Sequence, residues 1–405
     1  MPVIFAKVIA LAPYTTYDFL GKVIMRRAFP LYVVFFLLLT TSFALAAPMR
    51  VIYGFNREFP PFSYENPGGQ ATGFEVEIME AIFAEANVTL VKRPLQWDLV
   101  PLELSSGAVT VTAGMVQTGQ HSRLFLFSDK AVFPLHIKLF TKTYKRHPSL
   151  GLYRGLPVAV EENSFSQRLL EQYGGMNIKP LKDKGLALRD LYNDAVSAYC
   201  GPVPNTYYYI NKLNYGAITT VGSPLAIVST RIAVNKNRGD ILRLVNEGLE
   251  RIMNNGEYAR IYRNWFVREL SKEELTILAK SAAQGGTPAY APYSGKTEGA
   301  AILTATGKII TGCTVENADP TLNISAMQSA LASAIAQGEY EITAATLVND
   351  KGEVIQPTQK DLQALHELNI GTLIPLEDKE NGPYSAMVLE LLEAPVFKDI
   401  IPLQR

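Results

Sequence analysis

The residues best placed to contact a small molecule lie in one stretch, from Thr110 to Asp129. Its first part alternates apolar residues with smaller or polar ones, a pattern that predicts a β-strand. The apolar positions are Val109, Val111, Ala113 and Met115. Gly114 allows another group to approach the backbone closely, and Thr118 with Gly119 ends the strand in a polar loop. In an α/β fold such a loop lies at the carboxyl edge of the sheet, where ligands bind. We therefore expect ligand contacts in this loop.

The elements that would position this loop alternate between strand and helix patterns. Residues Glu75 to Ala86 carry apolar side chains at helical spacing, and Trp97 to Leu104 predicts a second helix. Strands are predicted before them, from Val51 to Phe55 and from Val88 to Val91. This alternation is typical of an α/β fold.

Length and composition bound the class of protein. The chain has 405 residues, which favours two or three domains, and 48% of them are hydrophobic, enough to bury sizeable cores. The formal net charge is zero and no long basic run occurs, which argues against nucleic acid as a partner. The two cysteines, Cys200 and Cys313, lie far apart, and neither has the neighbours of a disulfide framework or a metal cluster.

The N-terminal region predicts export. A basic segment, Met25 to Ala28, precedes the apolar run from Phe29 to Leu39, and Ala44-Leu45-Ala46 has the pattern of a signal-peptide cleavage site. We expect residues 25–46 to be a signal peptide cleaved near Ala46, residues 1–24 to be an upstream extension, and the mature protein to be periplasmic or secreted. The alternative is an uncleaved anchor, although the run is shorter than the roughly 20 residues that span a bilayer. No cysteine follows the cleavage pattern, so a lipoprotein is not expected.

A series of motifs occurs in one order between residues 49 and 267. They are Phe59-Pro60-Pro61-Phe62, Thr72 to Glu77, Thr118 followed by Phe127-Ser128-Asp129, Gly155 to Val160, Ile232 to Lys236, Gly256-Glu257-Tyr258 and Trp265-Phe266. Together they resemble the family 3 extracellular solute-binding proteins, the bilobed periplasmic receptors for polar amino acids. The resemblance implies the type II periplasmic-binding-protein fold over residues 47–268. Two α/β lobes would be joined by crossing strands near Leu139 and Val221–Ser223, and would close on a ligand.

The ligand positions of that family are where this chain departs from it. The resemblance implies an arginine three residues after Thr118, to bind the ligand carboxylate, but that position is His121. A hydroxyl residue is expected two positions before Thr118, and the residue there is Val116. The aspartate that would receive the ligand ammonium is replaced by Tyr199, whereas Ser164 keeps a hydroxyl in the second lobe.

Replacing the arginine and the aspartate removes both charged partners of a zwitterion, at roughly 1.5–3 kcal/mol for each charged hydrogen bond. We therefore expect a cleft retuned for a less charged ligand, such as an aromatic one. The alternative is a scaffold whose cleft binds nothing. The candidate ligand-binding residues are Phe59, Phe62, Trp97, Gly114, Val116, His121, Ser164 and Tyr199.

A second domain is predicted after residue 268. Ser271 and Glu274 form a capping-box pattern that begins a helix ending near Ala283, before Gly285-Gly286. Two apolar runs flank Thr306-Gly307 as in a hairpin, and Ile342 to Val348 predicts a further strand. We expect this domain to span residues 269–380, with a C-terminal tail from 381 to 405.

This region resembles the cytidine deaminases. The matching segments are Ala289 to Ser294, Gly299 to Ala301 and Gly312 to Ala318. The resemblance implies an α/β/α sandwich that self-assembles. A zinc deaminase also needs a Cys or His ligand, a glutamate two residues later and a Pro-Cys-x-x-Cys segment. Here the first reads Ser325-Ala326-Met327 and the second Pro357 to Asp361, so the three ligands and the proton shuttle are missing. Thr314 replaces the ribose-contacting asparagine, and Glu316 remains.

These observations predict an exported binding protein fused to a catalytically inactive deaminase-like domain, without catalytic residues, metal or cofactor. Its expected partners are a small, amino-acid-like or aromatic ligand and an ABC-type transporter or a sensor. The C-terminal domain is expected to form homo-oligomers or to dock a partner. Two alternatives stay open: a secreted cytidine deaminase, with zinc bound by a different set of residues, and a structural protein in which both clefts are vestigial.

Overall fold

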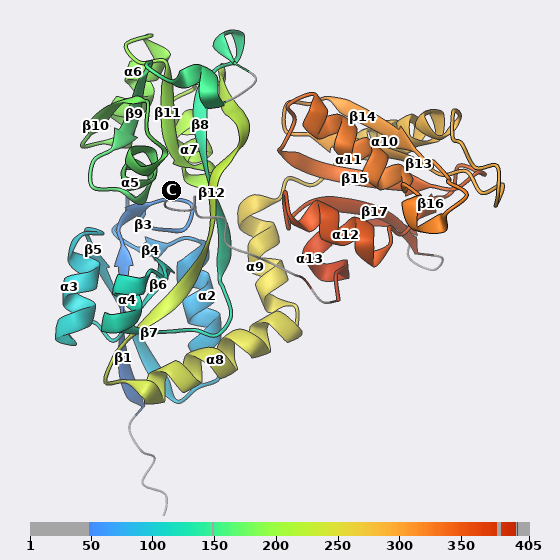
Figure 1. The fold of residues 1–405 in the computed structure, drawn as a ribbon. Coiled ribbons are helices and arrows are strands. Elements are labelled where there is room, and N and C mark those ends of the chain that lie inside the picture. Colours follow the sequence, from blue (N-terminus) through green and yellow to red (C-terminus); the bar gives the residue numbers. More distant parts are fainter. Residues whose placement is uncertain (1–47, 148–149, 379–381, 394, 396–405) are drawn as a thin grey trace, which may run out of the picture. The chain divides into compact units, whose positions relative to one another are not determined.

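The computed structural model describes residues 48–147, 150–378, 382–393 and 395 (Figure 1). The predicted signal peptide and the extension before it lie outside the described residues. In the predicted C-terminal tail, by contrast, residues 382–387 form a strand and residues 388–391 a short helix. No helix in the described ranges is long and apolar enough to cross a membrane.

One mixed sheet of nine strands forms the framework of residues 49–235. In sheet order its strands are β10 (Asn177–Leu181), β9 (Pro157–Glu161), β11 (Ala198–Pro202), β8 (Phe133–Lys142), β12 (Ile218–Asn235), β6 (Val111–Val116), β1 (Met49–Asn56) and β5 (Val88–Leu95), and β7 (Phe125–Phe127) also pairs with β12. Figure 1 shows two lobes, with β8 and β12 running through both. The register of the β8–β12 pair shifts between Val221 and Ala226, beside the residues where the sequence predicts the crossover.

Each lobe has its own helices and core. The first lobe holds α2 (Phe74–Phe83), α3 (Leu99–Ser106), α4 (Gly119–Leu124), α8 (Gly239–Asn254) and α9 (Glu257–Phe266), and a small sheet of β2 (Glu58–Phe59), β3 (Ser63–Glu65) and β4 (Ala71–Thr72). The second lobe holds α5 (Phe165–Tyr173), α6 (Lys184–Tyr192) and α7 (Val203–Lys212), with the short 3-10 helices η1 (Thr143–Lys145) and η2 (Leu150–Tyr153) nearby. The helices predicted from Glu75 and Trp97 are thus α2 and α3, with their ends shifted by a few residues.

Residues 272–391 build a separate six-stranded sheet. Its strand order is β14 (Ile309–Cys313), β13 (Gly299–Thr304), β15 (Ile342–Val348), β17 (Leu373–Asp378) and β18 (Gly382–Met387), with β16 (Val354–Ile355) beside β15. Its helices are α10 (Lys272–Gly286), α11 (Ala326–Ala336), α12 (Gln359–His366) and α13 (Val388–Leu391), with η3 (Pro320–Leu322). Apolar residues of α11, α12 and α13 share one core with alternate residues of the strands. The predicted hairpin is β13–β14, and the predicted strand is β15.

Helix α10 begins as predicted but is longer than predicted. The Ser271 hydroxyl accepts a hydrogen bond from the Glu274 amide, and the Glu274 carboxylate accepts one from the Ser271 amide. The helix continues through Gly286, and its two glycines lie against the sheet, Gly285 against Thr311 of β14 and Gly286 against Gly299 of β13. A Cβ on Gly299 would stand 2.0 Å from the Ala282 carbonyl oxygen, so helix and strand pack backbone to backbone. The glycines that suggested an end are a close-packing surface.

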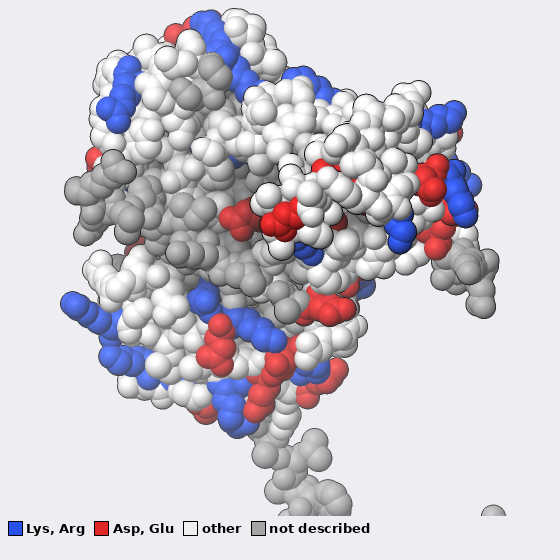
Figure 2. All heavy atoms as spheres, turned by 45° about the vertical axis from the view of Figure 1, so that its right-hand side comes forward, with Lys and Arg blue, Asp and Glu red and all other residues white. Residues whose placement is uncertain are grey.

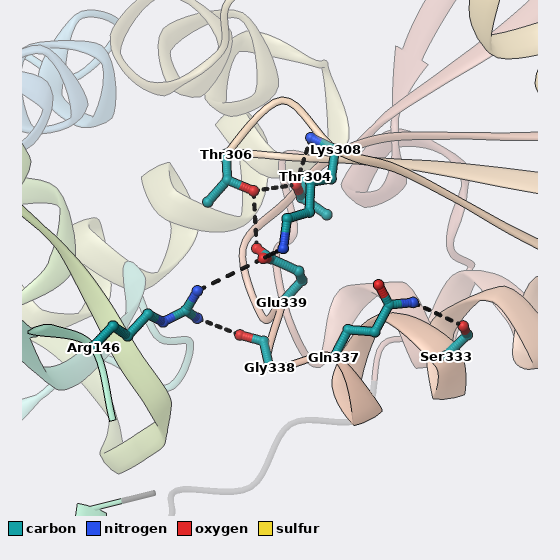
Figure 3. A network of polar contacts seen from close by, with 8 residues as sticks. All are labelled: Arg146, Thr304, Thr306, Lys308, Ser333, Gln337, Gly338 and Glu339. Atoms are coloured by element: carbon teal, nitrogen blue, oxygen red, sulfur yellow. Dashed lines mark hydrogen bonds and ion pairs between the residues drawn. The ribbon is translucent and has the colours of Figure 1, made fainter. Parts of the chain in front are cut away.

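A buried carboxylate joins several loops of the C-terminal sheet (Figure 3). Glu339 is 3% exposed; Lys308 Nζ lies 2.8 Å from its Oε1, and Thr306 donates to its Oε2 at 3.0 Å. Arg146, from the segment after η1, lies 3.6 Å from Oε1 and also donates to the Gly338 carbonyl. Burial opposes ionisation, but these partners, with Lys308 first, hold the pKa of Glu339 below its usual value.

Charged side chains are dispersed over the face drawn in Figure 2. Lysine and arginine alternate with aspartate and glutamate there, and uncharged residues separate them. This face carries no broad field of one sign, in keeping with the zero net charge.

Candidate functional site

The loop that the sequence singled out is a short helix rather than an open loop. β6 ends at Val116, and Thr118 caps α4 by accepting a hydrogen bond from the His121 amide at 3.1 Å. The His121 Nδ1 lies 2.9 Å from the Val116 carbonyl oxygen, so the imidazole folds back on the end of β6. Val116 and His121, both candidate ligand residues, are therefore in contact with each other.

Gly114 lies against a buried carboxyl group. Its φ is +79°, and a Cβ there would stand 2.3 Å from the Glu75 Oε1. Glu75 is 3% exposed, and burial raises its pKa to about 7 against the opposing effect of a hydrogen bond with Ser63. Burial also raises the pKa of Tyr53 well above its usual value, and the Glu75 charge adds to the effect. Near neutral pH, β6 therefore lies against a carboxyl group, that of Glu75, which can hold or release a proton.

The aromatic candidates divide into core and surface. Phe62 is 1% exposed and belongs to an aromatic core with Phe74, Phe133 and Phe266. Phe59 stacks on Phe62 with 5.1 Å between ring centroids, and Trp97 is 40% exposed. The structure thus makes Phe62 the support of Phe59 and leaves Trp97 on the surface.

The second-lobe candidates have structural partners. Ser164 caps α5: its hydroxyl accepts from the Gln167 amide at 3.1 Å and donates to the Glu161 carbonyl at 2.7 Å. Tyr199 is fully buried in the second-lobe core beside Phe140. Burial raises the pKa of Tyr199 well above its usual value, and the Glu161 charge adds to the rise.

Residues that the sequence did not single out connect the lobes. Lys184 is 4% exposed; its Nζ lies 2.7 Å from Glu161 Oε2 and donates to the Asn205 Oδ1. Asn205, itself fully buried, donates to the Pro60 carbonyl of the first lobe. The Lys184 Nζ also lies 5.8 Å from the centroid of Phe59 and 5.7 Å from that of Tyr209. One signal was available: Lys184 is the first residue of α6, where the helix dipole disfavours a cation.

Two cavities of the described structure lie away from these residues. One of about 420 Å³ is lined by residues of β1, β4 and β5, and another of about 430 Å³ by residues of α7, α9 and the C-terminal sheet. Neither is lined by Phe59, His121, Ser164, Lys184 or Tyr199.

The C-terminal residues at the zinc-ligand places converge, although none is a Cys or His. Ser325 donates to Asp361 Oδ1 at 2.5 Å, and the Thr358 hydroxyl donates to Asp361 Oδ2 at 2.7 Å. Asp361 is 1% exposed. Ser325 caps α11, and Thr358 forms a capping box with Asp361 at the start of α12. At the place of the glutamate, Met327 is fully buried in the core.

The remaining deaminase-like residues form hydrogen bonds with the backbone and side chains of neighbouring loops. Glu316 accepts hydrogen bonds from the Tyr293 and Ser294 amides at 2.9 and 3.1 Å, and from the Ser294 hydroxyl. These bonds, with the hydroxyl first, hold the pKa of Glu316 below its usual value. The Thr314 hydroxyl accepts from the Glu298 amide at 3.2 Å. Among the described residues, no three His, Cys, Asp or Glu side chains lie together as a metal site would require. His366 is half-buried at the end of α12.

Both parts of the chain match models of known protein families. Residues 51–268, just over half of the chain, match the family model of bacterial extracellular solute-binding proteins, family 3. Residues 249–361 match the model of the cytidine and deoxycytidylate deaminase zinc-binding region.

Relatives of both kinds are found among characterised proteins. The L-cystine-binding protein TcyJ of Escherichia coli (strain K12) is 22% identical over 228 residues, which are 55% of this chain and 84% of that protein. A probable histidine-binding protein of Neisseria gonorrhoeae is 25% identical over 219 residues, 53% of this chain and 82% of that protein. The cytidine deaminase of Halalkalibacterium halodurans is 35% identical over 92 residues, 23% of this chain and 70% of that protein.

Solved structures share the bilobed fold. A histidine kinase sensor domain with similarity to periplasmic binding proteins gives a TM-score of 0.51 at 22% identity, over 54% of this chain and 97% of that domain. The chain therefore belongs to the bacterial extracellular solute-binding proteins of family 3, and its C-terminal part belongs to the cytidine deaminase family.

Proposed function

We propose that this protein is an exported solute-binding protein whose cleft takes a small, weakly charged ligand, amino-acid-like or aromatic. Binding would occur between the two lobes, with Phe59, Val116, His121 and Ser164 nearest the ligand and Phe62 and Gly114 as supports. The family's extracellular setting and the signal-like residues 25–46 support export to the periplasm or the medium.

The observation that carries this proposal is that the chain keeps the two lobes, whereas the residues at both charged positions of the family are replaced. At the arginine position, the His121 imidazole is held by the Val116 carbonyl. At the aspartate position, Tyr199 is buried in the core. A free amino acid would leave its carboxylate without a guanidinium and its ammonium without the counter-charge.

We further propose that the C-terminal domain does not deaminate cytidine and serves in oligomerisation or in docking a partner, such as a transporter or sensor component. Ser325, Thr358 and Asp361 already use their oxygen atoms on one another and on two helix ends. Met327 has no proton to shuttle. The alternative, a secreted cytidine deaminase, predicts a tightly bound zinc ion.

Two measurements on the purified full chain test these proposals. A thermal-shift screen of amino acids, nucleosides and small aromatics should show stabilisation by an uncharged or aromatic compound, worth about 2.7 kcal/mol at a concentration 100 times its dissociation constant. Metal analysis should find no stoichiometric zinc, and cytidine should release no ammonia. Preferential binding of a zwitterion with a charged side chain would contradict the first proposal, and zinc with ammonia release would contradict the second.

A further inference from the structure

The surroundings of the Lys184 ammonium are those of a cation-binding site. A carboxylate oxygen of Glu161 lies 2.7 Å away, the amide oxygen of Asn205 accepts from it, and two aromatic rings, of Phe59 and Tyr209, lie within 6 Å. A carboxylate together with aromatic faces is the combination that binds alkylammonium groups. These groups come from both lobes, because Phe59 belongs to the first and the others to the second.

The position of Lys184 at the start of its helix is unfavourable for a cation. Lys184 is the first residue of α6, where the partial positive charge of the helix N-terminus opposes a cation. Its side chain is 4% exposed, so the ammonium has lost nearly all of its water, whereas Glu161 is 36% exposed. The contacts with Glu161, Asn205 and the two aromatic rings therefore stabilise the ammonium group in this place, and the helix dipole does not.

The same contacts join the lobes. Asn205 accepts from Lys184 through its amide oxygen and donates through its amide nitrogen to the Pro60 carbonyl, beside Phe59. An occupant of the cation site thus orients Asn205 for the contact with the first lobe. In this arrangement an internal side chain does what a bound ligand does in a closing cleft.

We propose that Glu161, Asn205, Phe59 and Tyr209 form an alkylammonium-binding site between the lobes, and that Lys184 fills it as a tethered occupant. The class of external ligand that this site takes is a primary alkylammonium, which binds when the lysine side chain is absent or displaced. The proposal rests on the proposed solute-binding role, because it places an ammonium site in the interlobe cleft.

Chemical rescue of the full-length Lys184→Ala variant is the test. The substitution removes three carbons and the ammonium, which n-propylammonium replaces atom for atom. We expect the Tm to fall by at least about 5 °C. n-Propylammonium should restore most of the loss along a saturable curve, methylammonium less of it, and neutral 1-propanol none. The wild type should not respond to these amines at the same concentrations.

Matched variants separate this site from a general effect of amines. Lys182→Ala, an exposed lysine two residues earlier, should lose little stability and show no rescue. Adding Glu161→Gln to Lys184→Ala should abolish the rescue, because the counter-charge is gone. Should Lys184→Ala not fold alone, its refolding yield with n-propylammonium and with 1-propanol gives the same comparison.

Equal rescue by 1-propanol, rescue that survives Glu161→Gln, or no rescue at all would overturn the proposal. An uncharged ligand found for the wild type in the screen would leave the proposed function standing even if the rescue failed. Rescue by n-propylammonium, together with a screen that finds no uncharged ligand for the wild type, would support the ammonium site. It would count against the proposal that the cleft takes a weakly charged ligand.

Discussion

The interlobe region and the deaminase-like region both carry residues other than those that the family resemblances imply, but these residues and their neighbours make different kinds of contact in the two regions. In the interlobe region the contacts are an ion pair within the second lobe, Lys184–Glu161, and a hydrogen bond that joins the two lobes, Asn205–Pro60. In the C-terminal domain they are short hydrogen bonds among Ser325, Thr358 and Asp361, which also cap two helices of one core.

The two regions differ in what their contacts support. The Asn205–Pro60 hydrogen bond joins two lobes, and under the ammonium-site proposal an alkylammonium takes the place of the Lys184 side chain once that side chain is removed. The Ser325–Asp361–Thr358 cluster cannot open without uncapping α11 and α12. We therefore expect substitutions in the first region to alter binding as well as stability, and those in the second to alter stability alone.

The largest expected effect comes from rebuilding the metal site. The variant Ser325→His, Met327→Glu, Thr358→Cys, Asp361→Cys should bind one zinc ion per chain, measured by metal analysis after dialysis. The positions already converge within hydrogen-bonding distance, and a structural zinc site contributes on the order of 10 kcal/mol. Met327→Glu alone is the control and should bind none. Failure of the fourfold variant to take up zinc would show that the helix ends do not form the deaminase geometry.

Removing the centre of the same cluster should unfold it locally. Asp361→Ala leaves the Ser325 and Thr358 hydroxyls without their acceptor in a buried place, at a cost of about 2–4 kcal/mol. Both tryptophans lie before residue 268, so amide hydrogen exchange of α11 and α12 is the appropriate measurement. Asp350→Ala, in an exposed turn, is the control. Equal exchange in the two variants would contradict a structural role for the cluster.

The first lobe should respond to pH through Glu75. Because burial raises its folded-state pKa from 4.5 to about 7, the folded state keeps a proton that the unfolded chain releases. Stability should therefore fall as the pH rises from 4.5 to 7, by roughly 3 kcal/mol in total. Glu75→Gln should flatten this dependence of stability on pH. Urea unfolding monitored by tryptophan fluorescence measures the free energy of unfolding at each pH. Glu85→Gln, on the exposed end of the same region, should leave the slope unchanged.

The smallest effect concerns Ser164, which is proposed to contact the ligand and which caps α5 as Ser325 caps α11. Ser164→Ala should cost about 1 kcal/mol, whereas Ser164→Asp should retain the cap. Ser271→Ala, at the capping box of α10, should cost a similar amount and is the matched control. If Ser164→Ala weakens ligand binding without loss of stability, its hydroxyl contacts the ligand and not the helix.

Local sequence patterns predicted several of the elements. The apolar alternation of β6, the helical spacing of α2 and the capping box of α10 are interactions between near neighbours, so they can be found without a fold. Where prediction erred, a tertiary contact decided. Gly285 and Gly286 suggested the end of a helix, but α10 continues through them, and they pack closely against β14 and β13. Phe62 suggested a ligand contact, but the aromatic core of the first lobe buries it.

By itself, the sequence determined the residue types at the motif positions: where the family resemblances imply an arginine, an aspartate and zinc ligands, it carries His121, Tyr199, Ser325, Thr358 and Asp361. Only the tertiary structure decided which contacts such residues and their neighbours make. Ser325 and Asp361 are 36 residues apart, and Asn205 and Pro60 are 145 apart, yet each pair is hydrogen-bonded. Contacts over such separations form only when whole elements pack, because the packed elements offset the entropy of closing the loops between them. For the same reason the burial of Lys184 beside Glu161 is evident only in the fold.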